Sequence, residues 1–214
     1  MRNYNKINWN EINNQLKQAK EEYWGCFNFS NYGLTEIPSE VFEIDSVCEL
    51  DLSYNRFQDI PSDISKLTNL SYLILDSNKI TTLPKDLIQL TNLYEIYLEE
   101  NDLTSIPSII FEIPTLTGLS LGFNQIEKLP ANISQLKNIE SLDLRANDLT
   151  ELPEELFELT NLKYLFLEDN QLKEISSSIC KLTKLEKLTL LDNPITEIPD
   201  CVSQVTDLSK LSVN

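Results

Sequence analysis

The sequence predicts an α/β fold in which a short unit repeats along the chain, a right-handed solenoid whose parallel strands form a curved, horseshoe-shaped sheet with helical or irregular turns on its convex side. Asparagine recurs with a period of 23 residues at Asn55, Asn78, Asn101, Asn124, Asn147, Asn170 and Asn193. Proline keeps the same period at Pro38, Pro61, Pro84, Pro107, Pro130, Pro153 and Pro199, with Ser176 as the one interruption. A fixed period of this length is the signature of a solenoid.

Each repeat supplies one strand and one return segment. The pattern is LxxLxLxxNxLxxLPxxIxxLxN, seen as LSYLILDSNKITTLPKDLIQLTN over residues 70–92. The LxLxx part alternates apolar and polar residues, which predicts a short strand with its leucines inward. The proline then begins a return segment, whose apolar pairs such as Ile64 and Leu67 close the convex side of the core. A single repeat cannot bury these residues alone, so neighbouring repeats must stack.

This pattern resembles the leucine-rich-repeat family. Copies run in register from a degenerate first one at Trp24 to an eighth at Leu185, and a ninth begins at Leu208 and stops at Asn214. The resemblance implies that the seven periodic asparagines form a structural ladder, because in this family that side chain bonds the backbone of adjacent turns. Tyr32 takes the asparagine position of the first copy, so the ladder should be imperfect there.

A narrower resemblance concerns the type of repeat. The LPxxI repeats are similar to the intracellular arrays of Ras-pathway scaffolds. The stretch from Ile12 to Phe42 is similar to the first repeat of bacterial arrays, including those of Roco-type proteins. These likenesses imply a signalling or scaffolding role in the cytoplasm.

Before the repeats, the sequence predicts an amphipathic helix that caps the N-terminal end. Ile12, Leu16, Ala19 and Tyr23 follow one another at spacings of four, three and four residues, which places them on one helix face. We therefore expect a capping helix within residues 1–23 and a repeat array over residues 24–214.

Composition restricts the function. The chain has 34 acidic and 17 basic residues and a net charge of −17, so its surface repels phosphate backbones and anionic lipids, and we expect neither nucleic acid nor membrane as partner. No secretion signal or membrane span is visible. The four cysteines are scattered, and Cys26 and Cys48 occupy different positions of the repeat. This favours free thiols over disulfides, and with them a reducing, cytoplasmic location.

Enzymatic chemistry has no candidate residues. The chain has no histidine, which removes Ser-His-Asp and Cys-His arrangements and imidazole metal sites. Its four glycines form neither GxxxxGK nor GxGxxG, and the carboxylates lack a dedicated calcium loop. We expect no catalytic residue, no metal and no cofactor.

The outward strand positions carry the binding hypothesis, because they form a surface that can vary while the framework repeats. Aromatic and aliphatic residues gather there with charged neighbours, and the partner-binding candidates are Tyr54, Tyr72, Ile74, Tyr97, Glu99, Phe123, Asp143, Arg145, Tyr164, Phe166 and Glu168. Such a surface predicts a protein partner with a basic rim and an apolar centre. The alternative is that the aromatic residues only stabilise the sheet by cross-strand stacking.

Two further alternatives concern the whole protein. The array could be the sensing or scaffolding portion of a multidomain signalling enzyme of GTPase or ligase type, with its catalytic domain outside this chain. The ninth copy supplies Leu208, Leu211 and Val213 without a return segment, which leaves an incompletely protected strand edge. Either the natural chain continues past Asn214 or two chains meet through this edge, so the protein is a monomer or an end-to-end dimer.

Overall fold

The structure of the protein, a computed structural model, describes residues 9–22 and 25–204. The chain divides into two compact units, Met1–Asp102 and Leu103–Asn214. Each unit is a stack of repeats whose strands are parallel, and the two units are described separately below.

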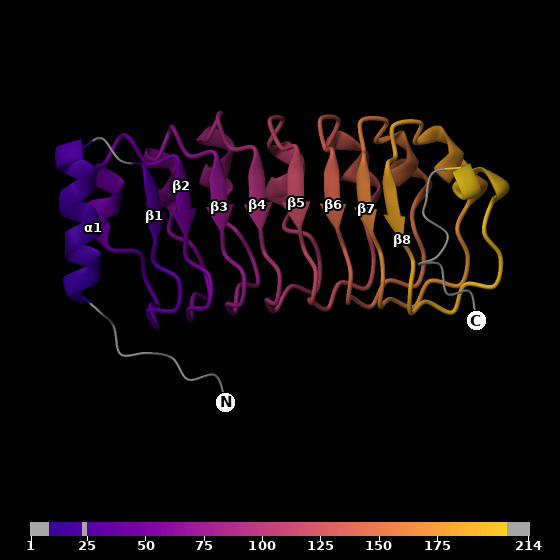
Figure 1. Cartoon of the computed structure of the whole chain (residues 1–214), viewed down its shortest axis with the longest axis horizontal. Helices are drawn as coiled ribbons and strands as arrows, with labels where there is room; N and C mark the ends of the chain where they lie inside the picture. Colours follow the sequence, from indigo (N-terminus) through magenta and orange to yellow (C-terminus); the bar gives the residue numbers. More distant parts are fainter. Residues whose placement is uncertain (1–8, 23–24, 205–214) are drawn as a thin grey trace. The chain divides into compact units, whose positions relative to one another are not determined.

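The N-terminal unit begins with the helix α1 (Trp9–Glu22) and continues with four strands that pair in parallel in chain order (Figure 1). The strands are β1 (Cys26–Asn28), β2 (Glu49–Asp51), β3 (Tyr72–Ile74) and β4 (Glu95–Tyr97). Between them lie the 3-10 turns η1 (Ser39–Glu43), η2 (Ser62–Lys66) and η3 (Lys85–Gln89).

The C-terminal unit repeats this plan. Its strands, which also pair in parallel in chain order, are β5 (Gly118–Ser120), β6 (Ser141–Asp143), β7 (Tyr164–Phe166) and β8 (Lys187–Thr189). Its 3-10 turns are η4 (Ser108–Glu112), η5 (Ala131–Gln135), η6 (Glu154–Glu158), η7 (Ser177–Lys181) and η8 (Asp200–Gln204).

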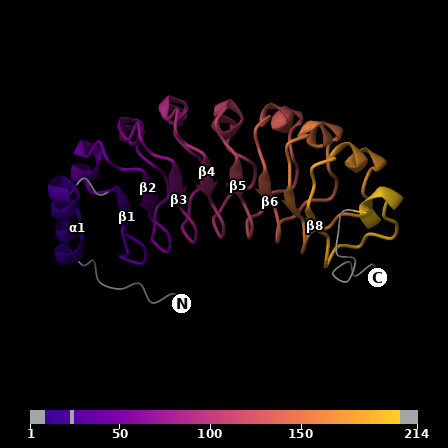
Figure 2. The same cartoon turned by 45° about the horizontal axis from the view of Figure 1, so that its top comes forward.

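The repeated sequence pattern explains both the strands and the 3-10 turns. The middle residue of a strand points inward, and Leu50, Leu73 and Leu165 are fully buried. The proline before each turn fixes a φ suited to the start of a helical turn, and Ser176 replaces it before η7 by accepting a hydrogen bond from the Ser178 N–H. Within each unit the strands and the turns lie on opposite sides of the core (Figure 2), which confirms the predicted repeat solenoid.

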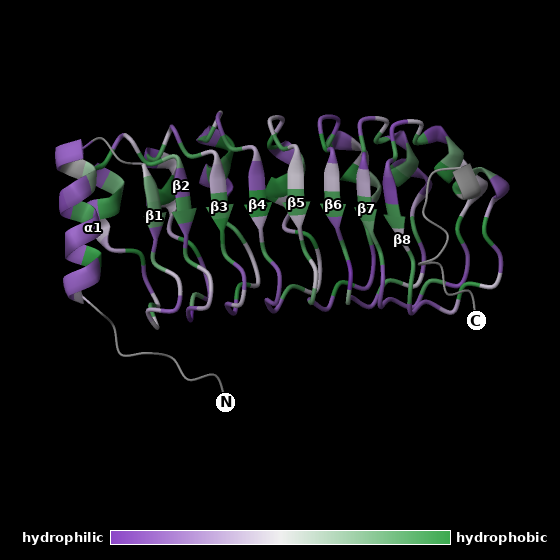
Figure 3. Cartoon of the chain, in the orientation of Figure 1, coloured by the Kyte–Doolittle hydropathy of each residue, from purple (hydrophilic) through white to green (hydrophobic). Residues whose placement is uncertain are grey.

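The helix α1 covers the free edge of β1. Ile12, Leu16 and Ala19 are buried, as the predicted stripe requires, and hydrophilic residues occupy most of the rest of the helix (Figure 3). The Gln15 side chain donates to the Asn28 carbonyl at 2.8 Å and accepts from the Asn28 N–H at 3.2 Å. Because unpaired strand edges invite association, this double contact protects the N-terminal end of the sheet.

Several predictions fall on residues outside the described ranges. These residues are Tyr23 of the predicted capping helix, Trp24 at the predicted start of the repeat array, and Leu208, Leu211 and Val213 of the ninth copy. The boundaries of cap and array at 23 and 24 and the end-to-end dimer therefore stay predictions. Within residues 9–22 and 25–204, no helix has the length and apolar character that a membrane crossing requires.

Candidate functional site

The candidate surface of the N-terminal unit consists of the outward side chains of β2 to β4 and of the turns that follow them; we call it the N-terminal sheet face. Tyr54 and Tyr72 are 54% and 40% exposed, and Ile74 and Tyr97 are half-buried. Ile74 is the register partner of Tyr97 across β3 and β4, so the two form one apolar pair. The structure thus places Tyr72, Ile74 and Tyr97 on one face of the N-terminal unit, and Tyr54 in the turn that follows β2.

Carboxylates surround this apolar group. Tyr72 has Glu49 as its register partner on β2 and Glu95 on β4. The Tyr97 hydroxyl donates a hydrogen bond to the Glu95 carboxylate. Burial, then this hydrogen bond and the charge of Glu95, raise the pKa of Tyr97 above its ordinary value. The Glu99 N–H donates to the Asp76 carboxylate at 2.7 Å, so the predicted Glu99 lies half-buried at the exit of β4.

The backbone after each strand is unusual. In every described repeat, the residue before the ladder position has a φ between 49° and 60°, and Tyr54 and Phe123 are among these residues. This left-handed region favours glycine, and a bulky residue there costs about 1–2 kcal/mol. The same two residues keep 54% and 53% of their surface exposed.

The candidate surface of the C-terminal unit, the C-terminal sheet face, is formed by the outward side chains of β5 to β8 and their exit turns. Arg145 lies with its guanidinium carbon 5.7 Å from the centre of the Phe123 ring and pairs with Asp143 at 3.0 Å. Gly122 makes room for it, because a Cβ there would lie 3.1 Å from the Arg145 Cγ. A cation over an aromatic face is attracted by the ring quadrupole.

Asp143 requires a correction. The sequence places it among exposed partner contacts, but the structure buries it, with 8% of its surface exposed. One carboxylate oxygen accepts from the Arg145 N–H at 3.1 Å and the other pairs with the Arg145 guanidinium. Both carboxylate oxygens of Asp143 thus contact Arg145.

The second aromatic cluster contains Tyr164 and Phe166. The Tyr164 hydroxyl donates to Glu186 at 3.0 Å, which together with the charge of Glu186 raises the pKa of Tyr164. The Lys187 ammonium lies 4.9 Å from the centre of the Phe166 ring. The predicted residue Glu168 accepts a hydrogen bond from the Thr189 hydroxyl. Polar groups of the same unit therefore already contact both rings.

The periodic asparagines are buried in both units and contact the backbone of two repeats. Asn147 is representative: its amide donates to the carbonyls of Leu121, Leu144 and Arg145 at 3.0–3.2 Å, and its oxygen accepts from the Ile126 N–H at 3.0 Å. At the N-terminal end, Asn55 accepts from both the Tyr32 and Leu34 N–H groups. This covers the first repeat, which has no asparagine of its own at that position.

Two family models match the sequence. The model described as "Leucine rich repeat" matches residues 29–80, and the model described as "Leucine-rich repeat region" matches residues 115–213. Together they cover most of the stacked repeats described above. The chain belongs to the leucine-rich-repeat family.

Solved leucine-rich-repeat structures resemble this chain. The Leptospira interrogans LRR protein LIC12759 matches with a TM-score of 0.77 and 35% identity over 83% of this chain and 45% of that one. The plant peptide hormone receptor RGFR1 in complex with RGF2 matches with a TM-score of 0.64 and 20% identity over 89% of this chain and 36% of that one. This chain thus spans less than half the length of either. The comparison with curated proteins finds no match.

Sequence reasoning missed a second asparagine series in the leucine-rich repeats. Asn69, Asn92, Asn138 and Asn161 each donate a side-chain hydrogen bond to a carbonyl 24 residues earlier, at 2.7–3.0 Å. Their common place at the end of the LxN motif was the available signal. The exposed Tyr94 and Ile88, at 43% and 47%, were also missed because they lie outside the outward strand positions.

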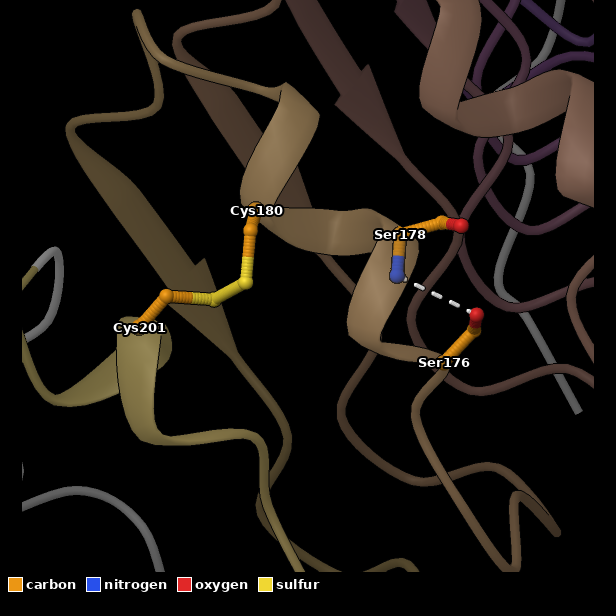
Figure 4. Close-up of a disulfide and its surroundings, with 4 residues drawn as sticks. All are labelled: Ser176, Ser178, Cys180 and Cys201. Atoms are coloured by element: carbon orange, nitrogen blue, oxygen red, sulfur yellow. Dashed lines mark hydrogen bonds between the residues drawn. A yellow bond between two sulfur atoms is a disulfide. The ribbon is translucent and has the colours of Figure 1, made fainter.

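The cysteine prediction was wrong for one pair. Cys180 of η7 and Cys201 of η8 form a disulfide with 5.8 Å between their Cα atoms (Figure 4), whereas Cys26 and Cys48 are free thiols. The bonded cysteines are 21 residues apart, two fewer than the repeat, so they too occupy different repeat positions. The adjacent turns η7 and η8 bring the two cysteines together although their repeat positions differ. Different repeat positions therefore do not exclude a disulfide. Burial, followed by the neighbouring Cys48, raises the pKa of Cys26.

Within the described residues, no group of three or more cysteine, aspartate or glutamate side chains is arranged to hold a metal ion.

Proposed function

We propose that this chain is a protein-interaction module that binds a partner protein on its sheet faces. The observation that carries the proposal is the exposure of Tyr54, Tyr72 and Phe123, which keep 54%, 40% and 53% of their surface accessible beside buried leucines. Aromatic residues desolvate large areas on binding and dominate interface energetics. The surrounding carboxylates suit a partner with a basic rim and an apolar centre.

The alternative role, stabilising the sheet, fits these residues less well. Cross-strand stacking contributes about 0.2–1 kcal/mol per pair and requires residues within the strands. Tyr54 and Phe123 lie beyond the strands in left-handed turns, where their side chains add a local cost. A contact made only in a complex would account for Tyr54, whereas the ring of Phe123 already has the Arg145 guanidinium over it.

The plant receptor is one instance in which this fold is found in complex with another molecule. At 20% identity it supports the fold and carries no residue to this chain. The partner of this protein, its lack of enzymatic activity and its likeness to Ras-pathway or Roco-type arrays are part of the proposal.

The proposed compartment differs from the one expected from the sequence. Disulfides persist in oxidising compartments and are rare in the cytosol. The Cys180–Cys201 bond therefore leads us to propose an oxidising compartment in place of the cytoplasm.

Site-directed photo-crosslinking in native cells tests the binding face. A photoreactive residue at Tyr72, which is 40% exposed, samples the N-terminal sheet face. One at Ile88 of η3, which is 47% exposed, samples an apolar position on the turn side. We expect a discrete crosslinked product from position 72 that is absent from position 88, and its loss when Tyr97→Ala is added. The same product from position 88 alone would reject the sheet face.

A further inference from the structure

The N-terminal sheet face contains an aromatic ring between two carboxylates. Tyr72 of β3 is in register with Glu49 on one side and Glu95 on the other. Strands lie about 4.8 Å apart and register partners share a face, so the two carboxylates stand on either side of the ring. Tyr72 is 40% exposed, and its ring is accessible from solvent. We call this arrangement the Glu49–Tyr72–Glu95 triad.

The triad keeps acceptor capacity. Glu95 accepts the Tyr97 hydroxyl hydrogen bond, which holds its carboxylate beside the sheet. A carboxylate has about four lone-pair sites, so one such bond leaves room for further donors. The Ile74–Tyr97 pair lies next to the triad and offers apolar contact for the methylene groups of a long side chain.

The C-terminal sheet face shows what such an arrangement attracts. There, the chain's own Arg145 lies over Phe123 and pairs with Asp143, and its own Lys187 lies over Phe166. Two of the three aromatic rings on that face, those of Phe123 and Phe166, are thus matched with a cation from the same unit.

The N-terminal sheet face has no such cation. Residues 49–54, 72–77 and 95–100 include six carboxylates and neither lysine nor arginine, whereas the four corresponding segments of the C-terminal unit include four carboxylates and two cations. The repeat position of Lys187 holds Glu49, Tyr72 and Glu95 in the N-terminal unit. The repeat position of Arg145 holds Ser53, Asp76 and Glu99, so neither of the two positions that carry positive charge in the C-terminal face is basic in the N-terminal face.

We infer that the Glu49–Tyr72–Glu95 triad binds a lysine or arginine side chain of the partner, with the cation on the Tyr72 ring between the two carboxylates. The inference rests on the proposed function and specifies its partner as a chain that presents a cation beside an apolar residue. A guanidinium or ammonium gains both ring attraction and ion pairing there, and two carboxylates in a net-negative face disfavour an anionic side chain.

A defined peptide tests this chemistry on the full chain. The probe is a fluorescent peptide of alternating arginine and leucine, and its counterpart replaces each arginine with citrulline, which keeps the shape and removes the charge. We expect the arginine peptide to bind roughly tenfold tighter or more by fluorescence anisotropy, as a cation over an aromatic face with ion pairing would give. Raising the salt concentration should reduce the difference in affinity between the arginine and citrulline peptides.

Variants locate the effect. Glu49→Gln with Glu95→Gln should bring the two peptides to similar affinity, and Tyr72→Leu, which keeps apolar bulk, should weaken only the arginine peptide. The matched control is Glu43→Gln with Glu112→Gln, which removes the same charge from exposed positions in the turns η1 and η4. It should leave the preference for arginine intact.

The outcomes separate the two proposals. Equal binding of both peptides, no binding of the arginine peptide, or an equal loss in the control variant would each overturn the cation site. If Tyr72→Ala weakens the binding of both peptides equally, the sheet face remains the binding site. Only the assignment of a cation to Tyr72 then fails. If the arginine preference holds but position 72 gives no crosslink in cells, the site stands and the proposed function fails.

Discussion

Replacing both Cys180 and Cys201 with serine should loosen the C-terminal unit by a predictable amount. The disulfide closes a loop of 21 residues. In the chain-entropy treatment, a loop of this length reduces the entropy of the unfolded chain by about 11 cal/mol/K, or about 3 kcal/mol at 25 °C. Both cysteines also line a cavity of about 240 Å³ with Leu182, Leu185 and Leu188.

The loss should be local because repeat proteins depend on contacts between neighbouring repeats. The disulfide joins η7 to η8, and we expect amide hydrogens of residues 182–202 to exchange faster in the variant while those of β2 to β4 are unchanged. Urea unfolding monitored by far-ultraviolet circular dichroism gives the free energy. A reducing agent should bring the wild type to the variant's level and leave the variant unaffected.

The control replaces Cys26 and Cys48 with serine, the same change at two free thiols. Unchanged urea midpoint and amide exchange in the Cys180→Ser/Cys201→Ser variant would show that the bond contributes nothing to stability. Alkylation of the protein inside native cells addresses the compartment: Cys26 and Cys48 should react and the disulfide pair should not.

Three further predictions concern single residues. Asn147→Ala should lower the free energy of unfolding by about 1–3 kcal/mol, since buried backbone groups lose their partner, whereas Asn132→Ala in η5 should have little effect. Equal urea midpoints for the two variants would contradict the asparagine ladder. Tyr54→Gly should be more stable than Tyr54→Ala by about 1 kcal/mol, because glycine adopts the left-handed φ of 56° without strain, and calorimetry that ranks alanine higher would reject this. The pKa of Tyr97 is raised in the folded state, so the unfolded chain loses the hydroxyl proton first and the free energy of unfolding should fall as the pH rises above about 10. Tyr97→Phe should reduce this fall when urea midpoints are measured against pH, and an unaltered pH profile would argue against the raised pKa.

The periodic part of the fold could be predicted because it depends on one repeated solution. Leu50, Leu73 and Leu165 are buried at the same repeat position, and the asparagines bond the backbone of two repeats wherever they occur. One sequence period therefore fixes strand, turn and ladder together. The capping helix was predictable for the same reason, since Ile12, Leu16 and Ala19 must lie on one face to cover β1.

The remaining features depend on contacts between unlike positions. The disulfide joins positions that differ by two within the repeat, and the buried Asp143 pairs with Arg145, an arginine that stands at this repeat position in one repeat only. The hydrogen bond between Tyr97 and Glu95 likewise requires a tyrosine and a carboxylate two residues apart on one strand, which occurs in β4. A periodic pattern carries no information on such pairs, because each occurs once.

The left-handed turns after the strands combine a backbone that repeats with side chains that do not. The framework imposes a positive φ before every ladder position, and no described repeat places glycine there, although glycine would be the least strained residue. At Ser77 the neighbouring Glu100 carboxylate accepts the side-chain hydroxyl, which offsets part of the cost. Tyr54 and Phe123 combine the same backbone with a ring that is about half exposed, and at Phe123 the Arg145 guanidinium lies over that ring. Sequences break local rules chiefly where function requires it. If the proposed function holds, substitution at these two positions should weaken partner binding more than it weakens folding.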